Sequence, residues 1–108
     1  MENKTKAQTF VGFAVRSRKF KIGLNACATM KRAELMIICK TASENSKKEG
    51  LSLSKKLRCE LICFKDEKLE DLVHRENAKI MAISDKALAN AIKKEAQDEF
   101  TVVSQENN

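Results

Sequence analysis

Continuous apolar runs of strand length recur three times along the chain. They fall at residues 35–39 (LMIIC), 60–64 (ELICF) and 79–83 (KIMAI). A run of this length without regular polar alternation is typical of a strand buried on both faces of a sheet. A shorter apolar segment at Phe20–Ile22 predicts a further short strand or an extended link.

Between these runs, apolar residues recur at the three- and four-residue spacing of amphipathic helices. The predicted helices are Lys4 to about Ser17, Gly23–Lys31, a segment from Thr41 toward Leu57, Lys68–Val73, and a last helix after Ser84-Asp85. The expected core positions are Ala7, Phe10, Val11 and Ala14 in the first helix, Leu24, Cys27 and Ala28 in the second, and Leu88, Ile92, Ala96 and Phe100 in the last.

Local signals suggest how two of these helices begin. Thr41 and Glu44 have the spacing of a capping box, in which the hydroxyl caps the helix and the carboxylate reaches back. Ser84-Asp85 is positioned to cap the last helix. Gly50, inside the third helix, favours a weak point or a break there.

Helices that alternate with buried strands predict an α/β fold with helices on both faces of the sheet. The chain has 108 residues, 43% of them apolar and none of them proline, which fits one globular domain with a real core. We therefore expect a single domain over residues 1–103, followed by a frayed tail at residues 104–108.

The positive charge is concentrated near the start of the chain. The net charge is +6; residues 1–40 hold nine Lys or Arg against two Glu (+7), and the rest hold twelve against thirteen acids (−1). This asymmetry favours a polyanionic partner, with nucleic acid ahead of an anionic membrane surface, since no broad apolar face accompanies the charge. With neither a signal peptide nor an apolar stretch of about 18 residues, we expect a cytoplasmic protein.

One stretch combines several features of an anion receptor. Four cations fall within residues 16–21, and Gly23 follows immediately before a helical pattern. A helix start offers free N–H groups and a positive dipole end, and glycine lets the backbone approach a ligand closely. The simpler alternative is a solvated basic loop that joins two ordinary helices.

Three segments, in order, resemble the kink-turn-binding ribosomal protein family of the large-subunit seven-Ae type, and its bacterial YlxQ-like branch in particular. Residues 11–23 (VGFAVRSRKFKIG) are similar to L-G-L-A-x-R-A-G-K-L-x-x-G. Residues 35–48 (LMIICKTASENSKK) are similar to a strand followed by D-A-S-x-N-T-K-K. The third segment is Leu69–Ala89, in which residues 77–87 (NAKIMAISDKA) are similar to A-R-V-V-V-A-V-T-D-K-G. The resemblance extends over residues 11–96.

This resemblance implies a three-layer α/β/α sandwich around a mixed sheet of about four strands. It also implies a monomeric, non-enzymatic protein without a cofactor, which binds kinked structured RNA such as ribosomal RNA or an mRNA leader, and which is associated with the ribosome in some cases. The RNA would meet the start of the second helix and a loop near the last strand. Carried onto this sequence, the predicted RNA-binding residues are Arg16, Arg18, Lys19, Lys21, Gly23, Asn25, Thr29, Lys31, Val73, His74 and Arg75.

Within that set, Gly23 and Asn25 match the G-x-N of the family's G-A-N-E element, whose polar side chains read G·A pairs. Ala26 replaces its glutamate, and Thr29 stands where lysine often follows. The departures leave a second hypothesis open: a protein-interaction module that keeps the fold but has lost specific RNA recognition.

The remaining chemistry-bearing residues give weaker signals. The four cysteines lack C-x-x-C spacing and fall inside apolar patterns, so we expect small core hydrophobes, with a zinc site or a redox thiol as lesser alternatives. The acids of residues 66–71 are interpreted as surface charge. No nucleophile elbow, phosphate loop or G-x-G-x-x-G motif is present, and we expect neither catalysis nor a metal site.

Overall fold

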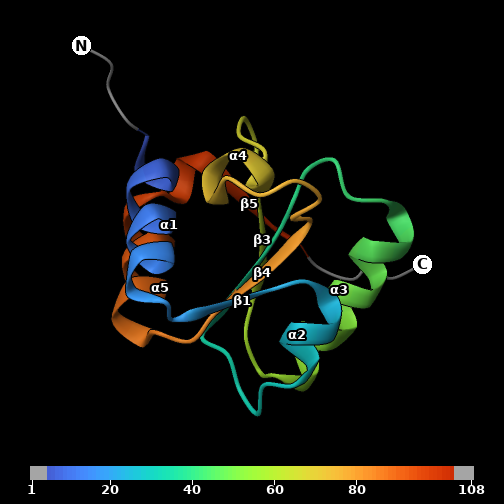
Figure 1. Ribbon diagram of the computed structural model, residues 1–108. Coiled ribbons are helices and arrows are strands. Elements are labelled where there is room, and N and C mark those ends of the chain that lie inside the picture. The colour runs from blue at the N-terminus through green and yellow to red at the C-terminus, as the bar shows by residue number, and fades with distance from the viewer. Residues whose placement is uncertain (1–4, 104–108) are drawn as a thin grey trace.

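The computed structural model describes residues 5–103 as a mixed β-sheet between two layers of helices (Figure 1). The predicted tail at residues 104–108 lies outside the described residues. In chain order the elements are α1 (Lys6–Ser17), β1 (Phe20–Ile22), α2 (Leu24–Ala28), β2 (Leu35–Ile38), α3 (Glu44–Lys56), β3 (Leu61–Phe64), α4 (Leu69–Val73), β4 (Ile80–Ile83), α5 (Lys86–Glu95), the 3-10 turn η1 (Gln97–Glu99) and β5 (Phe100–Val103).

The sheet has five strands in the order β1-β4-β2-β3-β5. β2 and β3 are parallel, and the other neighbouring strands are antiparallel. Strands β2 and β4 occupy the interior of the sheet and are buried at every position, as their continuous apolar runs predict. The predicted α/β fold with a mixed sheet is confirmed.

The fifth strand corrects the prediction at the end of the chain. Phe100 was expected on the last helix, but α5 ends at Glu95 and Phe100 begins β5. Phe100 pairs with Phe64 of β3, and the two rings meet edge to face with their centroids 6.1 Å apart. The four-residue apolar spacing persists because Ala96 and Phe100 contact the same core, although the backbone between them has left the helix.

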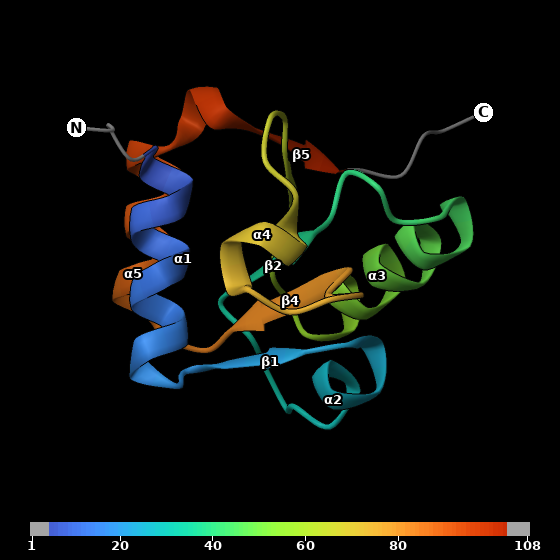
Figure 2. The same cartoon turned by 45° about the horizontal axis from the view of Figure 1, so that its top comes forward.

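The helices divide between the two faces of the sheet, as Figure 2 shows from a second angle. One apolar core lies between the sheet and α1, α4 and α5. A second, smaller core lies between the sheet and α2 and α3. Among residues 5–103, no helix has both the length and the apolar character needed to cross a membrane.

The first turn of α1 is capped by residues from both ends of the described chain. Thr5 and Gln8 form a capping box, in which each side chain accepts a hydrogen bond from the other residue's backbone N–H. The carboxylate of Glu99 in η1 accepts the N–H groups of Lys6 and Ala7 at 3.0 and 2.9 Å. The N–H groups of the first turn, which have no partner within a helix, are thus bonded to side chains.

The start of α3 differs from its prediction. Ser43, not Thr41, is the N-cap, and its hydroxyl accepts the N–H of Ser46 at 3.1 Å. The Thr41 hydroxyl instead accepts a hydrogen bond from Lys79 Nζ at 2.9 Å. The cap of the last helix is as predicted, since Asp85 accepts the N–H of Leu88 at 3.1 Å.

Gly50 does not break α3, which is continuous through it. The residue is buried, and a Cβ at this position would lie 2.8 Å from Cδ1 of Ile80 in the interior strand β4. The glycine therefore allows α3 to pack closely against the sheet.

Candidate functional site

The last turn of α1 and the link to β1 carry three of the predicted cations, all exposed: Arg16, Arg18 and Lys19. Arg18 ends α1 in the left-handed conformation, with φ 62°, and its N–H donates to the carbonyl of Val15. The Arg16 guanidinium stacks on the Phe13 ring at 5.0 Å. The ammonium of Lys19 lies 3.6 Å from Asp85, so part of its charge is balanced within the protein.

Strand β1 forms one edge of the sheet and presents Lys21 to solvent. Phe20 and Ile22 pack against the core beneath α1 and α4. Because alternate side chains of a strand point to opposite faces, Lys21 lies on the face covered by α2 and α3. The predicted cations therefore follow one continuous path from the end of α1, along β1, to α2.

Gly23 joins β1 to α2 and has a backbone conformation that suits glycine, with φ 97°. Nothing lies within 4 Å of the position that its Cβ would take, so glycine is favoured here by the positive φ angle and not by lack of space. Its N–H donates to the carbonyl of Ile80 at 2.9 Å. This bond ties the start of α2 to the start of β4.

Helix α2 is shorter than predicted: it ends at Ala28, not Lys31. The Thr29 hydroxyl donates to the carbonyl of Ala26 at 2.6 Å and closes the helix end, although Thr29 itself is exposed. Ala28 is exposed, contrary to its predicted core position, because a five-residue helix covers little of the sheet. Asn25 and Lys31 are exposed, as a binding role requires.

The loop between α4 and β4 contains the second predicted contact region. Val73, predicted to contact RNA, is buried in the core and only 4% exposed, so its side chain is not available to a ligand. His74 and Arg75 are exposed, and His74 ends α4 in the left-handed conformation. The Arg75 guanidinium lies 5.7 Å from the centroid of the Phe20 ring, which brings this loop against β1.

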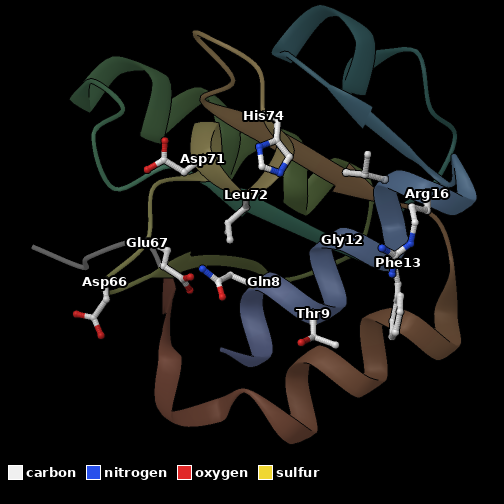
Figure 3. Close-up of a pocket in the computed structure, with 11 residues that line it drawn as sticks. Gln8, Thr9, Gly12, Phe13, Arg16, Asp66, Glu67, Asp71, Leu72 and His74 are labelled. Atoms are coloured by element: carbon white, nitrogen blue, oxygen red, sulfur yellow. The ribbon is translucent and has the colours of Figure 1, made fainter. Parts of the chain in front are cut away.

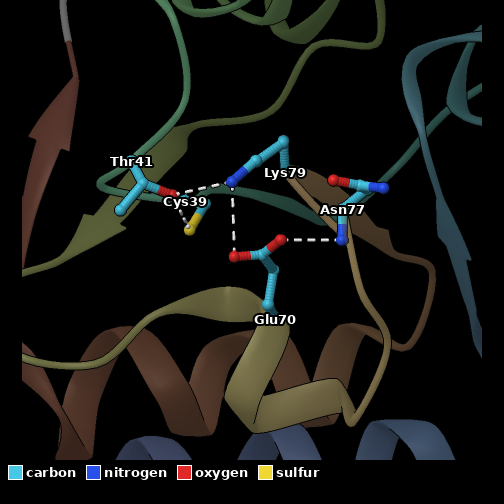
Figure 4. A network of polar contacts seen from close by, with 5 residues as sticks. All are labelled: Cys39, Thr41, Glu70, Asn77 and Lys79. Atoms are coloured by element: carbon cyan, nitrogen blue, oxygen red, sulfur yellow. Dashed lines mark hydrogen bonds and ion pairs between the residues drawn. The ribbon is translucent and has the colours of Figure 1, made fainter.

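A network of polar contacts holds this loop in place (Figure 4). The Glu70 carboxylate accepts the N–H of Asn77 at 2.7 Å and lies 3.3 Å from Lys79 Nζ. These two interactions, with the Asn77 hydrogen bond first, hold the pKa of Glu70 below its usual value. Sequence reasoning interpreted Glu70 as surface charge, since its partners lie seven and nine residues away and no local motif links them.

Three of the four cysteines have raised thiol pKa values. Burial raises the pKa of Cys27 and of Cys59 to about 11, and it also raises that of Cys63. Burial acts the same way on Cys39, but hydrogen bonds, chiefly from Thr41, outweigh it and lower the pKa of that thiol. Within residues 5–103, no three His, Cys, Asp or Glu side chains are grouped to hold a metal ion.

Two predicted contact segments thus meet at one edge of the sheet: residues 16–25 and residues 74–77. Arg75 lies over the Phe20 ring, and the bond from Gly23 to Ile80 joins the first segment to β4, the strand that follows the loop. Exposed guanidinium and ammonium groups along such an edge can bind phosphate oxygens, and the amide of Asn25 can both donate and accept hydrogen bonds.

Comparison with known proteins identifies the fold and leaves the family open. No protein-family model and no curated protein matches the chain. Among solved structures, a protein of unknown function from Bacillus halodurans is similar, with a TM-score of 0.73 and 15% sequence identity, over 83% of this chain and 95% of that one. At this identity the likeness concerns the fold alone.

Proposed function

We propose that this chain is a non-enzymatic protein that binds sharply bent, structured RNA along the β1 edge. The observation that carries the proposal is the contact of Arg75, in the loop at residues 74–77, with Phe20, in the segment of residues 16–25. The two segments lie far apart in sequence, and the resemblance described above assigns RNA contact to both. A bent RNA presents two backbone directions at once, which suits two contact segments on one surface.

The charge of this edge supplies sequence-independent affinity. Arg16, Arg18, Lys21 and Lys31 are exposed and belong to the first 40 residues, whose net charge is +7. If about four phosphates are neutralised, log K falls with log salt at a slope of roughly −3. Such contacts position the RNA but do not distinguish one sequence from another.

Discrimination is assigned to Asn25, which is exposed in the first turn of α2. A kink opens a groove that regular A-form RNA keeps too narrow for side chains, so an amide can reach base edges there. Ala26 provides no second polar group beside it. We therefore expect selectivity for a kinked RNA to depend on Asn25 more than on any neighbouring side chain.

The test is a titration of a kink-turn RNA labelled with two fluorophores, against an unkinked duplex of equal length, at about 150 mM monovalent salt. The proposal expects tight binding to the kinked RNA, with energy transfer reporting that the RNA bends. Equal, weak and salt-sensitive binding to both RNAs would contradict it. That outcome would favour a protein-interaction module, whose basic edge meets an acidic protein.

A further inference from the structure

A groove lies between α1 and α4 (Figure 3) and shares only Arg16 and His74 with the predicted RNA-binding residues. Its volume is about 740 Å³. Gly12 and Phe13 of α1 form one side, and Leu72 and His74 form the other. Three acidic side chains lie at one end: Asp66 and Glu67 from the loop before α4, and Asp71 from α4.

Gly12 has no role within the chain that the structure can explain. It lies in the interior of α1, where glycine is less stable than alanine by roughly 0.5–1 kcal/mol. Nothing lies within 4 Å of the position its Cβ would occupy. The glycine therefore keeps the side of the groove open to an atom from outside the chain.

An exposed aromatic ring adjoins this opening. Phe13 is 46% exposed, one of only two large hydrophobic side chains so exposed within residues 5–103. The Phe10 ring meets it edge to face, at 6.3 Å between centroids, and Arg16 stacks on it. A ring held by two neighbours is already ordered, so an apolar group can pack on it at little further entropic cost.

The acidic end of the groove carries more negative than positive charge. The groove contains Arg16 against Asp66, Glu67 and Asp71, which sum to −2 in a chain of net charge +6. Within the described residues, no Lys or Arg forms an ion pair with these three carboxylates. Lys40 reaches the backbone carbonyl of Asp66 at 3.2 Å, and Glu67 accepts the Thr5 hydroxyl.

We propose that this groove docks a short segment of a partner protein, in which an apolar side chain is followed by one or two basic ones. The apolar side chain packs over Gly12 and against Phe13, and the basic side chains meet Asp66 and Asp71. Charge complementarity selects this occupant, because the −2 charge repels the phosphates of a nucleic acid and attracts lysine or arginine. The inference does not depend on RNA binding.

The experiment is a selection from a random twelve-residue peptide library displayed on phage, with the full chain as immobilised target. A parallel selection uses Gly12→Leu, which fills the opening. We expect wild-type protein to enrich peptides with an apolar residue beside Lys or Arg. Synthetic copies should bind Gly12→Leu at least tenfold more weakly, and should likewise lose affinity for the double variant Asp66→Lys, Asp71→Lys.

The control is Glu49→Lys, which reverses an exposed acidic charge on α3, on the other face of the sheet. It should bind the peptides as the wild type does, and denaturation curves should show that every variant is folded. Equal enrichment on Gly12→Leu, enrichment of acidic peptides, or no enrichment would overturn the proposal. Sedimentation that shows a dimer abolished by Gly12→Leu would also overturn it, since the occupant would then be a second copy of the chain.

Discussion

Gly12 and Gly50 both lie in the interior of a helix, but on opposite faces of the sheet and in opposite surroundings. A Cβ on Gly50 would meet Ile80 Cδ1 at 2.8 Å, whereas a Cβ on Gly12 would meet nothing within 4 Å. The first glycine brings α3 close to the sheet, and the second leaves α1 open beside a groove. The same residue type thus serves packing on one face and leaves space on the other, a distinction that depends on residues distant in the sequence.

The most direct test of this comparison places leucine at both positions. Gly50→Leu should lower the free energy of unfolding by more than about 2 kcal/mol, because the buried site has no room for the side chain. Gly12→Leu should leave stability unchanged or raise it by about 0.5–1 kcal/mol, since leucine is the better helix former. Urea denaturation at neutral pH measures both. Equal losses at the two sites would show that α1 also packs closely there.

The variant Asn25→Ala tests whether α2 reads base edges in kinked RNA. If Asn25 reads base edges, its loss should weaken binding to kinked RNA by roughly 10–100-fold, which corresponds to about 1–3 kcal/mol. Affinity for an unkinked duplex should not change. Titrations of both RNAs at one salt concentration check this, and an equal loss for the two would remove the assignment of Asn25 to readout.

A smaller and uniform effect is expected for Lys21→Ala on the edge strand. All RNAs should bind more weakly by a similar factor, and the salt slope should shrink by about 1, since one phosphate contact is lost. The matched control is Lys94→Ala, which removes an exposed lysine from α5 on the other layer. If the control shifts affinity as much as Lys21→Ala does, the net charge of the chain, not the β1 edge, attracts the RNA.

The smallest effect is expected from Glu70→Gln in α4, and it is an effect on the stability of the fold. The folded-state pKa of Glu70 is depressed, so its charged form stabilises the fold above the unfolded-state value of about 4.3. This contribution is lost as the pH falls through the lower, folded-state pKa. Urea midpoints of wild type and variant should therefore differ most near pH 7 and converge near pH 3. A difference that does not depend on pH would assign the effect to packing.

Contiguous patterns predicted much of the fold. Strands β2 to β4 and the helices α1, α3 and α5 follow from apolar runs and periodicity, because each depends on neighbours within a few residues. β5 could not be predicted in this way, since its register is set by pairing with β3. The prediction of the α3 cap was wrong for a similar reason. Thr41 and Ser43 are both suitable N-cap residues, but the hydroxyl of Thr41 accepts a hydrogen bond from Lys79, which is 38 residues away.

In the candidate site, too, the features set by adjacent residues were predicted, and those set by the fold were not. The cations of residues 16–21 stand out because they are adjacent in sequence and exposed in the structure. Val73 was misplaced because a residue at a helix end can face either the core or solvent, and nothing local decides which. The groove was not predicted at all, since Gly12 and Leu72 become neighbours only in the folded chain.

The contact between Glu99 and the start of α1 affects when this helix becomes fully stable during synthesis of the chain. Two N–H groups at the beginning of the chain are bonded to a carboxylate 92 and 93 residues later. A ribosome releases residue 99 long after it has released residue 7, so α1 emerges first but reaches its final state only when the C-terminal turn is free to close on it. A nascent chain that stops before η1 therefore leaves the N–H groups of Lys6 and Ala7 without this acceptor, and the first turn of α1 is less stable until residue 99 is released.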